Sequence, residues 1–228
     1  DNFFDITITS PPYNLNRRTK YGKYIKAGQE ACQEKRSSDD LTIDKYFNWQ
    51  KQCIQEMIRV SSKYVFYNIQ MVTGNKPALF RLLGEFAYNI KEVIIWDKTR
   101  AEPAFLEGCL NTQFEFIIVF AKQNTINRTF EHFNFKKGQM SNVIQIKKNT
   151  SNKHHKQNAA CFPLELPHLL IKSFAATTDT IFDPFMGLGS TAIAAEVLKR
   201  TWCGIELLQS SIDIAMDKLA PYKHNLFT

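Results

Sequence analysis

Asp183 to Thr191, D-P-F-M-G-L-G-S-T, form a glycine-containing turn that could bind a small charged ligand. Gly187 and Gly189 lack a Cβ, so the backbone can turn tightly there and approach a ligand closely. Asp183 follows a short apolar run that predicts a strand, and ligands of open α/β sheets bind at such strand ends. The turn lacks the lysine of a P-loop and the third glycine of a dinucleotide fingerprint. A carboxylate here therefore favours a cationic amino acid or a ribose over a pyrophosphate.

The next predicted strand ends on a second carboxylate, Glu206, within C-G-I-E. In nucleotide-binding sheets of this type, such an acid binds ribose hydroxyls. A glycine turn alone is more often a tight strand–helix connection than a ligand site. The second acid shifts the balance toward a nucleoside ligand. Ser190 and Thr191 are also predicted to cap the helix that follows the turn.

Thr9 to Asn14, T-S-P-P-Y-N, could hold an amino group against an aromatic ring. Pro11 and Pro12 fix the backbone and remove two amide donors, which leaves carbonyl groups for binding. Ser10 and the Pro11 carbonyl could accept both hydrogens of one amine, while the ring of Tyr13 could stack on a base. Taken alone, the segment is equally well explained as a Pro-Pro strand terminator beside a surface tyrosine.

Strands and helices alternate around these two segments. Alternating or apolar runs predict strands at 3–9, 63–69, 93–96, 114–120, 180–182 and 202–205. Helical spacing of apolar residues predicts helices at 44–60, 77–86, 164–173, 190–199 and 210–219. This order is typical of an α/β fold with a mostly parallel sheet and helices on both faces. We expect one domain over residues 1–228.

The chain carries a net charge of +7, which is compatible with a polyanionic partner. Residues 121–158 form a basic insertion, and basic residues also follow the S-P-P-Y segment. If the partner is a nucleic acid, the candidates for phosphate contact are Arg17, Arg18, Lys20, Arg128, Lys136, Lys137, Lys147 and Lys148. Most lysine-rich stretches are simply solvated surface. The alternating Phe130, Phe133 and Phe135 predict a packed strand, and Trp96 is predicted to lie in the core.

The five cysteines are widely spaced and form no zinc pattern, so we expect reduced thiols, no metal and a cytoplasmic protein. His154 and His155 lack further ligands and are interpreted as surface residues. No apolar run reaches the roughly 20 residues of a membrane span, and no signal peptide is visible. The chain opens inside a predicted strand, so we expect that the natural N-terminus lies upstream.

Together, T-S-P-P-Y-N and D-P-F-M-G-L-G-S-T resemble motifs IV and I of the DNA amino-methyltransferases. Their order along the chain is similar to the circularly permuted β group, and the resemblance runs from Asp5 to about Leu219. It implies a Rossmann-like, S-adenosyl-L-methionine-dependent methyltransferase fold. It also implies a target-recognition role for residues 121–158.

The resemblance implies roles position by position. It makes Ser10, Pro11, Pro12 and Tyr13 the catalytic segment, which holds the target amine and stacks on a flipped base. N-A-A-C-F-P is similar to the segment that lines the methionine end of the cofactor. The implied cofactor residues are Asp183, Phe185, Gly187, Gly189, Ser190, Thr191, Glu206, Asn158 and Phe162.

Three positions depart from the family pattern. Leu188 replaces a small polar residue in the glycine turn, which should be tolerated if its side chain faces the protein. Asn158 stands where histidine is more common. The strand that precedes motif IV in the family, with a carboxylate near the adenine, is absent from these residues. We therefore expect either further sequence upstream or an incomplete adenine pocket.

The resemblance implies methyl transfer to an exocyclic amine of a DNA base, flipped out of the duplex. Adenine N6 is slightly favoured because it is the commoner activity of the group, whereas the serine of S-P-P-Y favours cytosine N4. An RNA or protein-amide substrate and an inactive nucleic-acid-binding module are the alternatives. We expect DNA as a partner in bacteria or phage, at the nucleoid. A homodimer that shares the DNA-binding surface stays open, as does a partner endonuclease.

Overall fold

The computed structural model describes residues 1–15, 40–104, 107–123, 126–148 and 163–222. Within these ranges, seven strands form one sheet in the order β5-β3-β4-β2-β1-β6-β7. The strands are β1 (Phe4–Thr9), β2 (Ser61–Ile69), β3 (Ile90–Glu102), β4 (Thr112–Ala121), β5 (Val143–Gln145), β6 (Thr180–Asp183) and β7 (Thr201–Gly204).

The sheet is mixed, with parallel pairing at most of its contacts. β1 pairs in parallel with β2 and with β6, β6 with β7, and β3 with β5. Only β4 breaks this pattern, because it runs antiparallel to both β2 and β3. The predicted mostly parallel sheet is confirmed.

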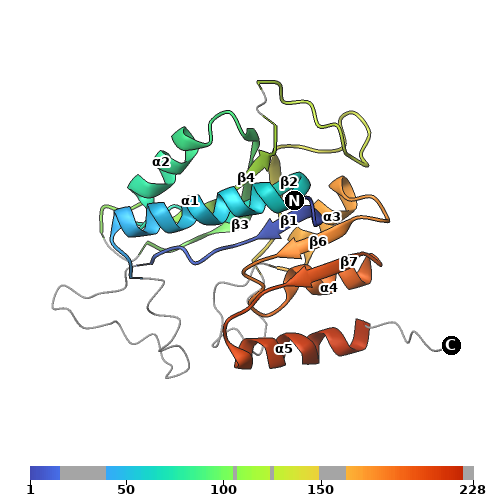
Figure 1. The fold of residues 1–228 in the computed structure, drawn as a ribbon. Helices are drawn as coiled ribbons and strands as arrows, with labels where there is room; N and C mark the ends of the chain where they lie inside the picture. The colour runs from blue at the N-terminus through green and yellow to red at the C-terminus, as the bar shows by residue number, and fades with distance from the viewer. Residues whose placement is uncertain (16–39, 105–106, 124–125, 149–162, 223–228) are drawn as a thin grey trace.

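Helices cover both faces of the sheet (Figure 1). The helices are α1 (Ile43–Val60), α2 (Lys76–Glu85), α3 (Glu165–Phe174), α4 (Ser190–Val197) and α5 (Gln209–Leu219), followed by a 3-10 turn at Ala220–Tyr222. Each lies where the apolar spacing of the sequence predicts a helix. None of the helices in the described part of the chain is long and apolar enough to cross a membrane.

β2 shows how the core is divided between the two faces, because successive side chains of a strand point to opposite sides. Tyr64 and Phe66 pack in the cluster that contains residues of α3 and α4. Val65 and Tyr67 pack in the cluster formed with α1 and α2. A strand buried on both faces needs a continuous apolar run, which β2 and β4 both supply.

Two strands differ from the predictions. β5 lies inside the basic insertion and has three residues, too few for a periodic signal. β3 extends well beyond the predicted 93–96, as far as Glu102. Trp96 is in the core as predicted, 2% exposed, and its Nε1 donates to the carbonyl of Ile146 beyond β5.

The three phenylalanines of the insertion do not form the predicted strand. Phe130 and Phe135 nevertheless pack against the core, and their rings contact Phe174 at the end of α3. Phe133 is half exposed and pairs with Phe135 at a ring distance of 5.1 Å. Packing is therefore confirmed for two of the three rings.

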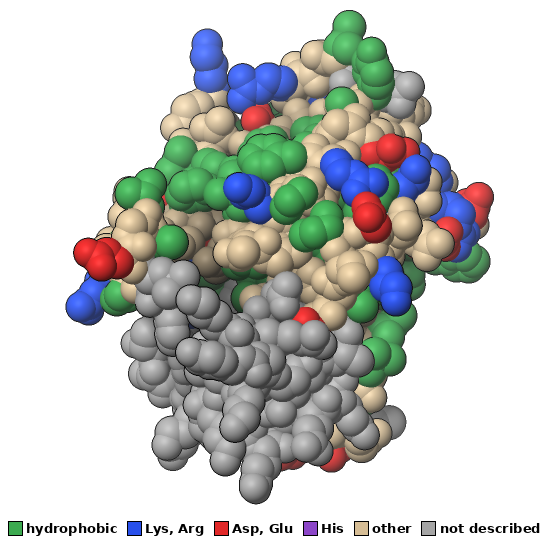
Figure 2. Space-filling model, turned by 90° about the vertical axis from the view of Figure 1, so that its left-hand side faces the viewer, with side chains coloured by type: hydrophobic (Ala, Val, Ile, Leu, Met, Phe, Trp, Pro, Cys, Tyr) green, Lys and Arg blue, Asp and Glu red, His purple; other side chains and the backbone are tan. Residues whose placement is uncertain are grey.

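The parallel strands β1, β2, β6 and β7 all end on the same side of the sheet. We call the edge where β1, β2, β6 and β7 end the carboxyl edge, and the edge where they begin the amino edge. The carboxyl edge lies on the left of Figure 1 and faces the viewer in Figure 2. Both segments singled out in the sequence directly follow strands at the carboxyl edge, β1 and β6.

Candidate active site

The two segments meet because β1 and β6 are parallel neighbours in the sheet. Thr9, the last residue of β1, donates a hydrogen bond of 2.6 Å from Oγ1 to Oδ1 of Asp183, the last residue of β6. Thr191, at the start of α4, donates a bond of 2.7 Å to Oδ2 of the same carboxylate. The amide of Phe185 adds a bond of 3.0 Å to Oδ1. Asp183 therefore joins the strand, the glycine turn and the helix.

Asp183 is a buried acid with an altered ionisation. Its side chain is 4% exposed. Burial, and to a smaller extent the nearby charge of Glu206, raises the pKa of Asp183, the three hydrogen-bond donors lower it, and the net result is a pKa of about 6. Loss of solvation disfavours the charged form, so a nearby cation would stabilise the carboxylate.

The glycine turn has the left-handed backbone that its two glycines allow. Gly187 has φ +54° and Gly189 has φ +81°, a region that residues with a Cβ seldom adopt. Gly189 is the N-cap of α4, and it packs so closely that a Cβ there would lie 3.1 Å from the Cβ of Ala215. Leu188 is 2% exposed, so its side chain faces the protein as expected.

The predicted capping of α4 by Ser190 and Thr191 is wrong. The N-cap residue is Gly189, which has no side chain that could accept a bond from the helix amides. The hydroxyl of Thr191 serves Asp183 instead of the helix amides. The charge-assisted bond to a buried carboxylate is stronger than a neutral bond to a helix amide.

Glu206 follows β7 and faces the glycine turn from the neighbouring strand. Its Oε2 accepts from the amide of Gly187 at 2.9 Å, and its Oε1 accepts from the amides of Leu207 and Leu208 at 3.1 and 3.0 Å. Oε1 thus accepts two bonds already, whereas Oε2 can accept a second bond and stays available for a ribose hydroxyl. Ile205 and Leu207, on either side, are 49% and 95% exposed and offer apolar surface.

These residues fit S-adenosylmethionine. A buried acid suits its positive charge, a second acid suits its ribose, and the exposed apolar side chains suit its adenine. Gly187 has no Cβ, so a ligand can approach the backbone of the turn closely there. Asn158 and Phe162, which the resemblance assigns to the cofactor, lie outside the described residues. Phe185 packs edge-on against Trp49, with 6.0 Å between the ring centroids.

Tyr13 is fixed through its hydroxyl group. The hydroxyl lies 2.8 Å from Oγ of Ser10, 3.0 Å from Oδ1 of Asn68 and 2.8 Å from Oε2 of Glu115. Burial raises the pKa of Tyr13 well above its usual value, and the charge of Glu115 adds to this rise. Tyr13 therefore stays protonated and donates its single proton to the carboxylate or the amide oxygen. Ser10 in turn donates to the tyrosine oxygen.

The rest of the S-P-P-Y-N segment is also tied to the scaffold. The carbonyl of Pro12 accepts a bond of 2.8 Å from the hydroxyl of Tyr46 on α1. Asn14 has φ +59° and is fully buried. Its Nδ2 donates to the carbonyls of Leu41 and Gly74, and its Oδ1 accepts from the amide of Leu41. The backbone around Ser10 and Tyr13 is therefore held at several points.

The candidate phosphate-binding residues divide between the two edges. Lys147 and Lys148 follow β5 at the carboxyl edge, where Lys148 pairs with Glu102 at 2.5 Å. Arg128 pairs with Glu92 at 2.6 Å near the start of β3, which is at the amino edge. Asn134, two residues before Lys136, donates to carbonyls at the end of α3, the helix that leads to the start of β6 at the same edge. The structure thus brings the two lysines, but not Arg128, Lys136 and Lys137, to the edge that carries Tyr13. Arg17, Arg18, Lys20, His154 and His155 lie outside the described residues.

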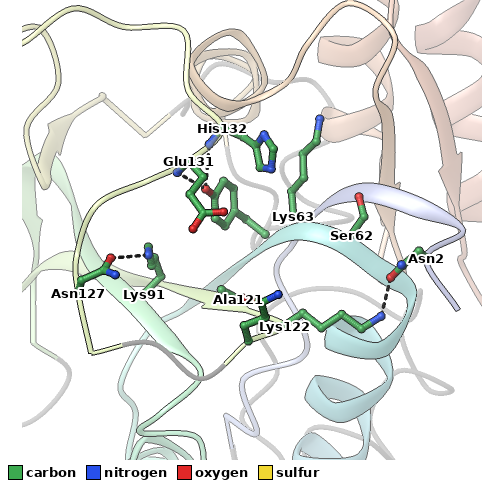
Figure 3. Close-up of a pocket in the computed structure, with 11 residues that line it drawn as sticks. Asn2, Ser62, Lys63, Lys91, Ala121, Lys122, Asn127, Glu131 and His132 are labelled. Carbon is green, nitrogen blue, oxygen red and sulfur yellow. Dashed lines mark hydrogen bonds between the residues drawn. The ribbon is translucent and has the colours of Figure 1, made fainter.

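A cavity of about 300 Å³ opens at the amino edge, away from the site (Figure 3). Lys63, Lys91, Lys122 and His132 contribute to its lining. The lysines already have partners, since Lys63 bonds to Asp179, Lys91 to Asn127 and Lys122 to Asn2. The described residues contain no group of histidine, cysteine and acidic side chains able to hold a metal ion.

The sequence reasoning missed three residues of this site, namely Thr9, Asn68 and Glu115. Thr9 and Asn68 give no signal beyond their places at or near strand ends. Glu115 does give one, because it is a single acid in the apolar run F-E-F-I-I-V-F and is 6% exposed. A charge within a buried strand needs a partner, and that alone marks it as a candidate.

The fold is a Rossmann-like α/β fold, and both candidate segments lie at its carboxyl edge. A family model described as DNA methylase, N6_N4_Mtase, matches residues 4–217. The chain belongs to this family of S-adenosylmethionine-dependent DNA amino-methyltransferases. The family resemblance inferred from the two motifs is confirmed.

Curated relatives agree with this assignment. The chain is 24% identical over 265 residues to the type II methyltransferase M.BglII of Bacillus subtilis, matching all of this chain and 67% of the relative. It is 25% identical over 240 residues to the type II methyltransferase M.HinfI of Haemophilus influenzae, matching 97% of this chain and 64% of the relative. The chain thus spans about two thirds of the length of these relatives.

Two solved structures share the fold. The complex of M1.HpyAVI with S-adenosylmethionine superposes with a TM-score of 0.62 at 20% identity, covering 95% of this chain and 88% of that one. PvuII DNA methyltransferase, described as cytosine-N4-specific, superposes with a TM-score of 0.65 at 17% identity. That match covers 100% of this chain and 82% of the other.

Proposed function

We propose that this chain transfers a methyl group from S-adenosylmethionine to an exocyclic amino group of a DNA base. The observation that carries the proposal is the hydrogen bond from Thr9 to Asp183. Because Ser10 directly follows Thr9, the segment that we propose to bind the amine begins next to the strand end that leads into the glycine turn. A methyl group bound at the turn would then have only a short path to an amine held at Ser10.

The target amine is a weak nucleophile, because its lone pair is delocalised into the base. Ser10 donates its own proton to Tyr13, so its lone pairs stay free to accept a hydrogen of the amine. The carbonyl of Pro11 would accept the second hydrogen, and the two acceptors together favour a pyramidal nitrogen. S-adenosylmethionine supplies, when bound, an electrophilic methyl group. Positioning of the amine for in-line attack is then the main task of the protein.

The base must leave the duplex to reach this segment, at a cost of a few kcal/mol. Stacking on Tyr13 would offset part of that cost, at roughly 1–3 kcal/mol for a stacked base. The anchored hydroxyl supports this role, because a ring held at its far end presents a fixed plane. Residues 9–14 contain no cysteine, so the segment offers no thiol for the covalent route used in C5 methylation of cytosine.

Adenine N6 is the acceptor that we test first, with cytosine N4 as the second. Adenine is favoured as the commoner target of this family. The serine at position 10 and the N4-specific PvuII neighbour favour cytosine. Ser10 and Pro11 would accept the hydrogens of either amine with the same geometry, so product analysis decides between the two bases.

DNA would approach the carboxyl edge, where Lys147 and Lys148 can neutralise phosphates. Exposed apolar side chains near the end of β2 and the start of β4 add contact surface at this edge, among them Met71, Leu110 and Phe114. Figure 2 shows such side chains gathered on this face beside lysines and arginines. We assign target recognition to residues 121–158 of a single domain, with a homodimer as one way to extend the surface. Bacterial or phage DNA as substrate implies a cytoplasmic protein.

Methyl transfer to unmethylated DNA from labelled S-adenosylmethionine tests the proposal, followed by digestion and mass identification of the nucleoside. We expect N6-methyladenine or N4-methylcytosine, and Tyr13→Ala as a matched control should remove most of the label. Label in RNA alone would transfer the proposal to RNA. No label in either polymer at low salt would leave a nucleic-acid-binding module.

A further inference from the structure

Behind Tyr13 lies a line of alternating charges that enters the protein. Glu115 on β4 accepts from the Tyr13 hydroxyl through Oε2, at 2.8 Å. Its other oxygen, Oε1, lies 3.5 Å from Nζ of Lys98 on β3. Lys98 Nζ also lies 3.4 Å from Oε2 of Glu102, whose Oε1 pairs with Lys148. The line thus runs from Tyr13, the proposed stacking residue, to Lys148 at the carboxyl edge, where we propose that DNA binds.

The central pair of this line is deeply buried. The side chain of Lys98 is 1% exposed and that of Glu115 is 7% exposed. Among the described residues, Lys98 Nζ has no partner at hydrogen-bond geometry, so its carboxylate contacts are purely ionic. A buried pair with such loose geometry seldom stabilises a fold more than apolar residues of the same size would. Its presence therefore calls for an explanation other than stability.

The ring of Tyr13 supplies that explanation. A tyrosine side chain turns about two bonds, so a fixed Cα alone does not fix the plane of the ring. Glu115 reaches the hydroxyl from β4, and Asn68 reaches it from β2. Two strands that carry none of the S-P-P-Y segment thereby set the orientation of the ring. A buried carboxylate can do this only if a cation offsets its charge.

We propose that Glu115 and Lys98 are positioning residues, which hold the Tyr13 ring in the plane needed to stack on the flipped base. Glu115 accepts the hydroxyl proton, and Lys98 is the counter-charge that permits a carboxylate at this depth. Both act through Tyr13 and touch neither the base nor the cofactor. The inference rests on the proposed function, since it names what orients the stacking ring.

Paired substitutions separate this role from a general role in folding. Lys98→Met/Glu115→Gln removes both charges and keeps a carbonyl oxygen at position 115 for the Tyr13 hydroxyl. Lys98→Met/Glu115→Leu removes the same charges and leaves no acceptor there. Tyr13→Phe removes the donor and keeps the ring. All three keep the buried charge balanced, which avoids the large cost of an unpaired buried ion.

We expect the glutamine pair to keep kcat within about threefold of the parent. The leucine pair and Tyr13→Phe should each lower kcat about tenfold, the effect of one well-placed hydrogen bond, with an unchanged KM for S-adenosylmethionine. The leucine pair should lower kcat no further in a Tyr13→Phe background. An equal loss of kcat in both backgrounds would overturn the proposal, as would a glutamine pair that does not fold.

A thermal-melting cycle on the same variants needs no activity. If Glu115 anchors Tyr13, the leucine pair should cost about 2–4 °C more in the parent than in the Tyr13→Phe background. Equal losses in the two backgrounds would overturn the anchoring contact. A parent chain that methylates no DNA would instead refute the proposed function, and the melting cycle would still report on the contact.

Discussion

The hydroxyl of Thr9 and the carboxylate of Asp183 lie 2.6 Å apart, although the residues are 174 positions apart in the chain. Each is the last residue of its strand, and β1 and β6 are parallel neighbours. The bond therefore joins β1, the first strand of the sequence, to β6, the strand that leads into the glycine turn. The order of the two motifs along the chain does not matter to the site, because the sheet brings their strand ends together.

Thr9→Val should lower the affinity for S-adenosylmethionine, beyond any effect of its loss of folding stability. The change keeps the side-chain shape but removes the donor to Asp183, so we expect about fivefold lower affinity for S-adenosylmethionine by calorimetry. Thr7→Val is the matched control, because Thr7 lies on the same strand, is equally buried and bonds to Ser61 instead. It should lower the melting temperature similarly and leave affinity unchanged. Equal affinity losses in both variants would contradict the role of Thr9.

Cofactor affinity should depend on pH through Asp183, whose pKa burial raises to about 6. S-adenosylmethionine is cationic and favours the ionised carboxylate, so below pH 6 binding must displace a proton. We expect affinity to fall toward tenfold per pH unit below pH 6 and to be level above pH 7. Asp183→Asn should bind weakly with no such dependence. A parent profile as flat as that of the variant would exclude Asp183 as the titrating group.

The same raised pKa predicts a change in stability of opposite direction. The folded chain binds a proton at Asp183 more tightly than the unfolded chain, whose aspartate has a pKa of about 3.9. The contribution of Asp183 to stability therefore falls as pH rises from about 4 to about 6 and is constant above. The melting temperature of Asp183→Asn relative to that of the parent should therefore be highest at pH 8 and should fall toward pH 4. A difference that grows toward pH 4 would contradict the burial effect.

Tyr13→Ala and Asp183→Ala should separate catalysis from cofactor binding. Tyr13→Ala removes the stacking ring and should lower kcat by roughly tenfold to a hundredfold, with cofactor affinity within about threefold of the parent. Asp183→Ala should abolish measurable cofactor binding. Single-turnover methylation and calorimetry on the same preparations provide the comparison. Equal loss of cofactor affinity in both variants would refute this division of roles.

Lys147→Gln and Lys137→Gln should differ in their effect on DNA binding. Both residues are exposed and lie in the basic insertion, but only Lys147 follows β5 at the carboxyl edge. If Lys147 contacts a phosphate, its loss should reduce the slope of log affinity against log salt by about 0.9. Lys137→Gln should leave the slope unchanged within error. A larger change for Lys137 would place the DNA at the amino edge.

Most of the fold could be predicted from local sequence patterns. The helices and the strands that flank the two motifs have strong periodicity or apolar runs, so α1 and β4 lie close to their predicted ranges. The antiparallel direction of β4 could not be predicted, because strand direction depends on pairing across the sheet rather than on local pattern. β5 has three residues and is specified by its pairing with β3.

The site was predictable where the residue type itself carries the chemistry. Asp183, Glu206 and the glycines have carboxylates or backbone freedom that suggest a use without a structure. Thr9 and Asn68 are ordinary polar residues, and only the sheet shows what they contact. For the lysines of the basic insertion, the sequence shows the charge but not the position, because charge alone does not tell at which edge of the sheet each lysine lies.

Asn14 bonds to both backbone groups of Leu41, 27 positions further along the chain. The two ends of the intervening segment are therefore clasped together by a side chain that belongs to neither α1 nor β1. The clasp lies one residue beyond Tyr13 and ties its backbone to the residue two positions before α1. The ring is thus restrained from its main chain as well as from its hydroxyl, as a beam is when it is supported at both ends.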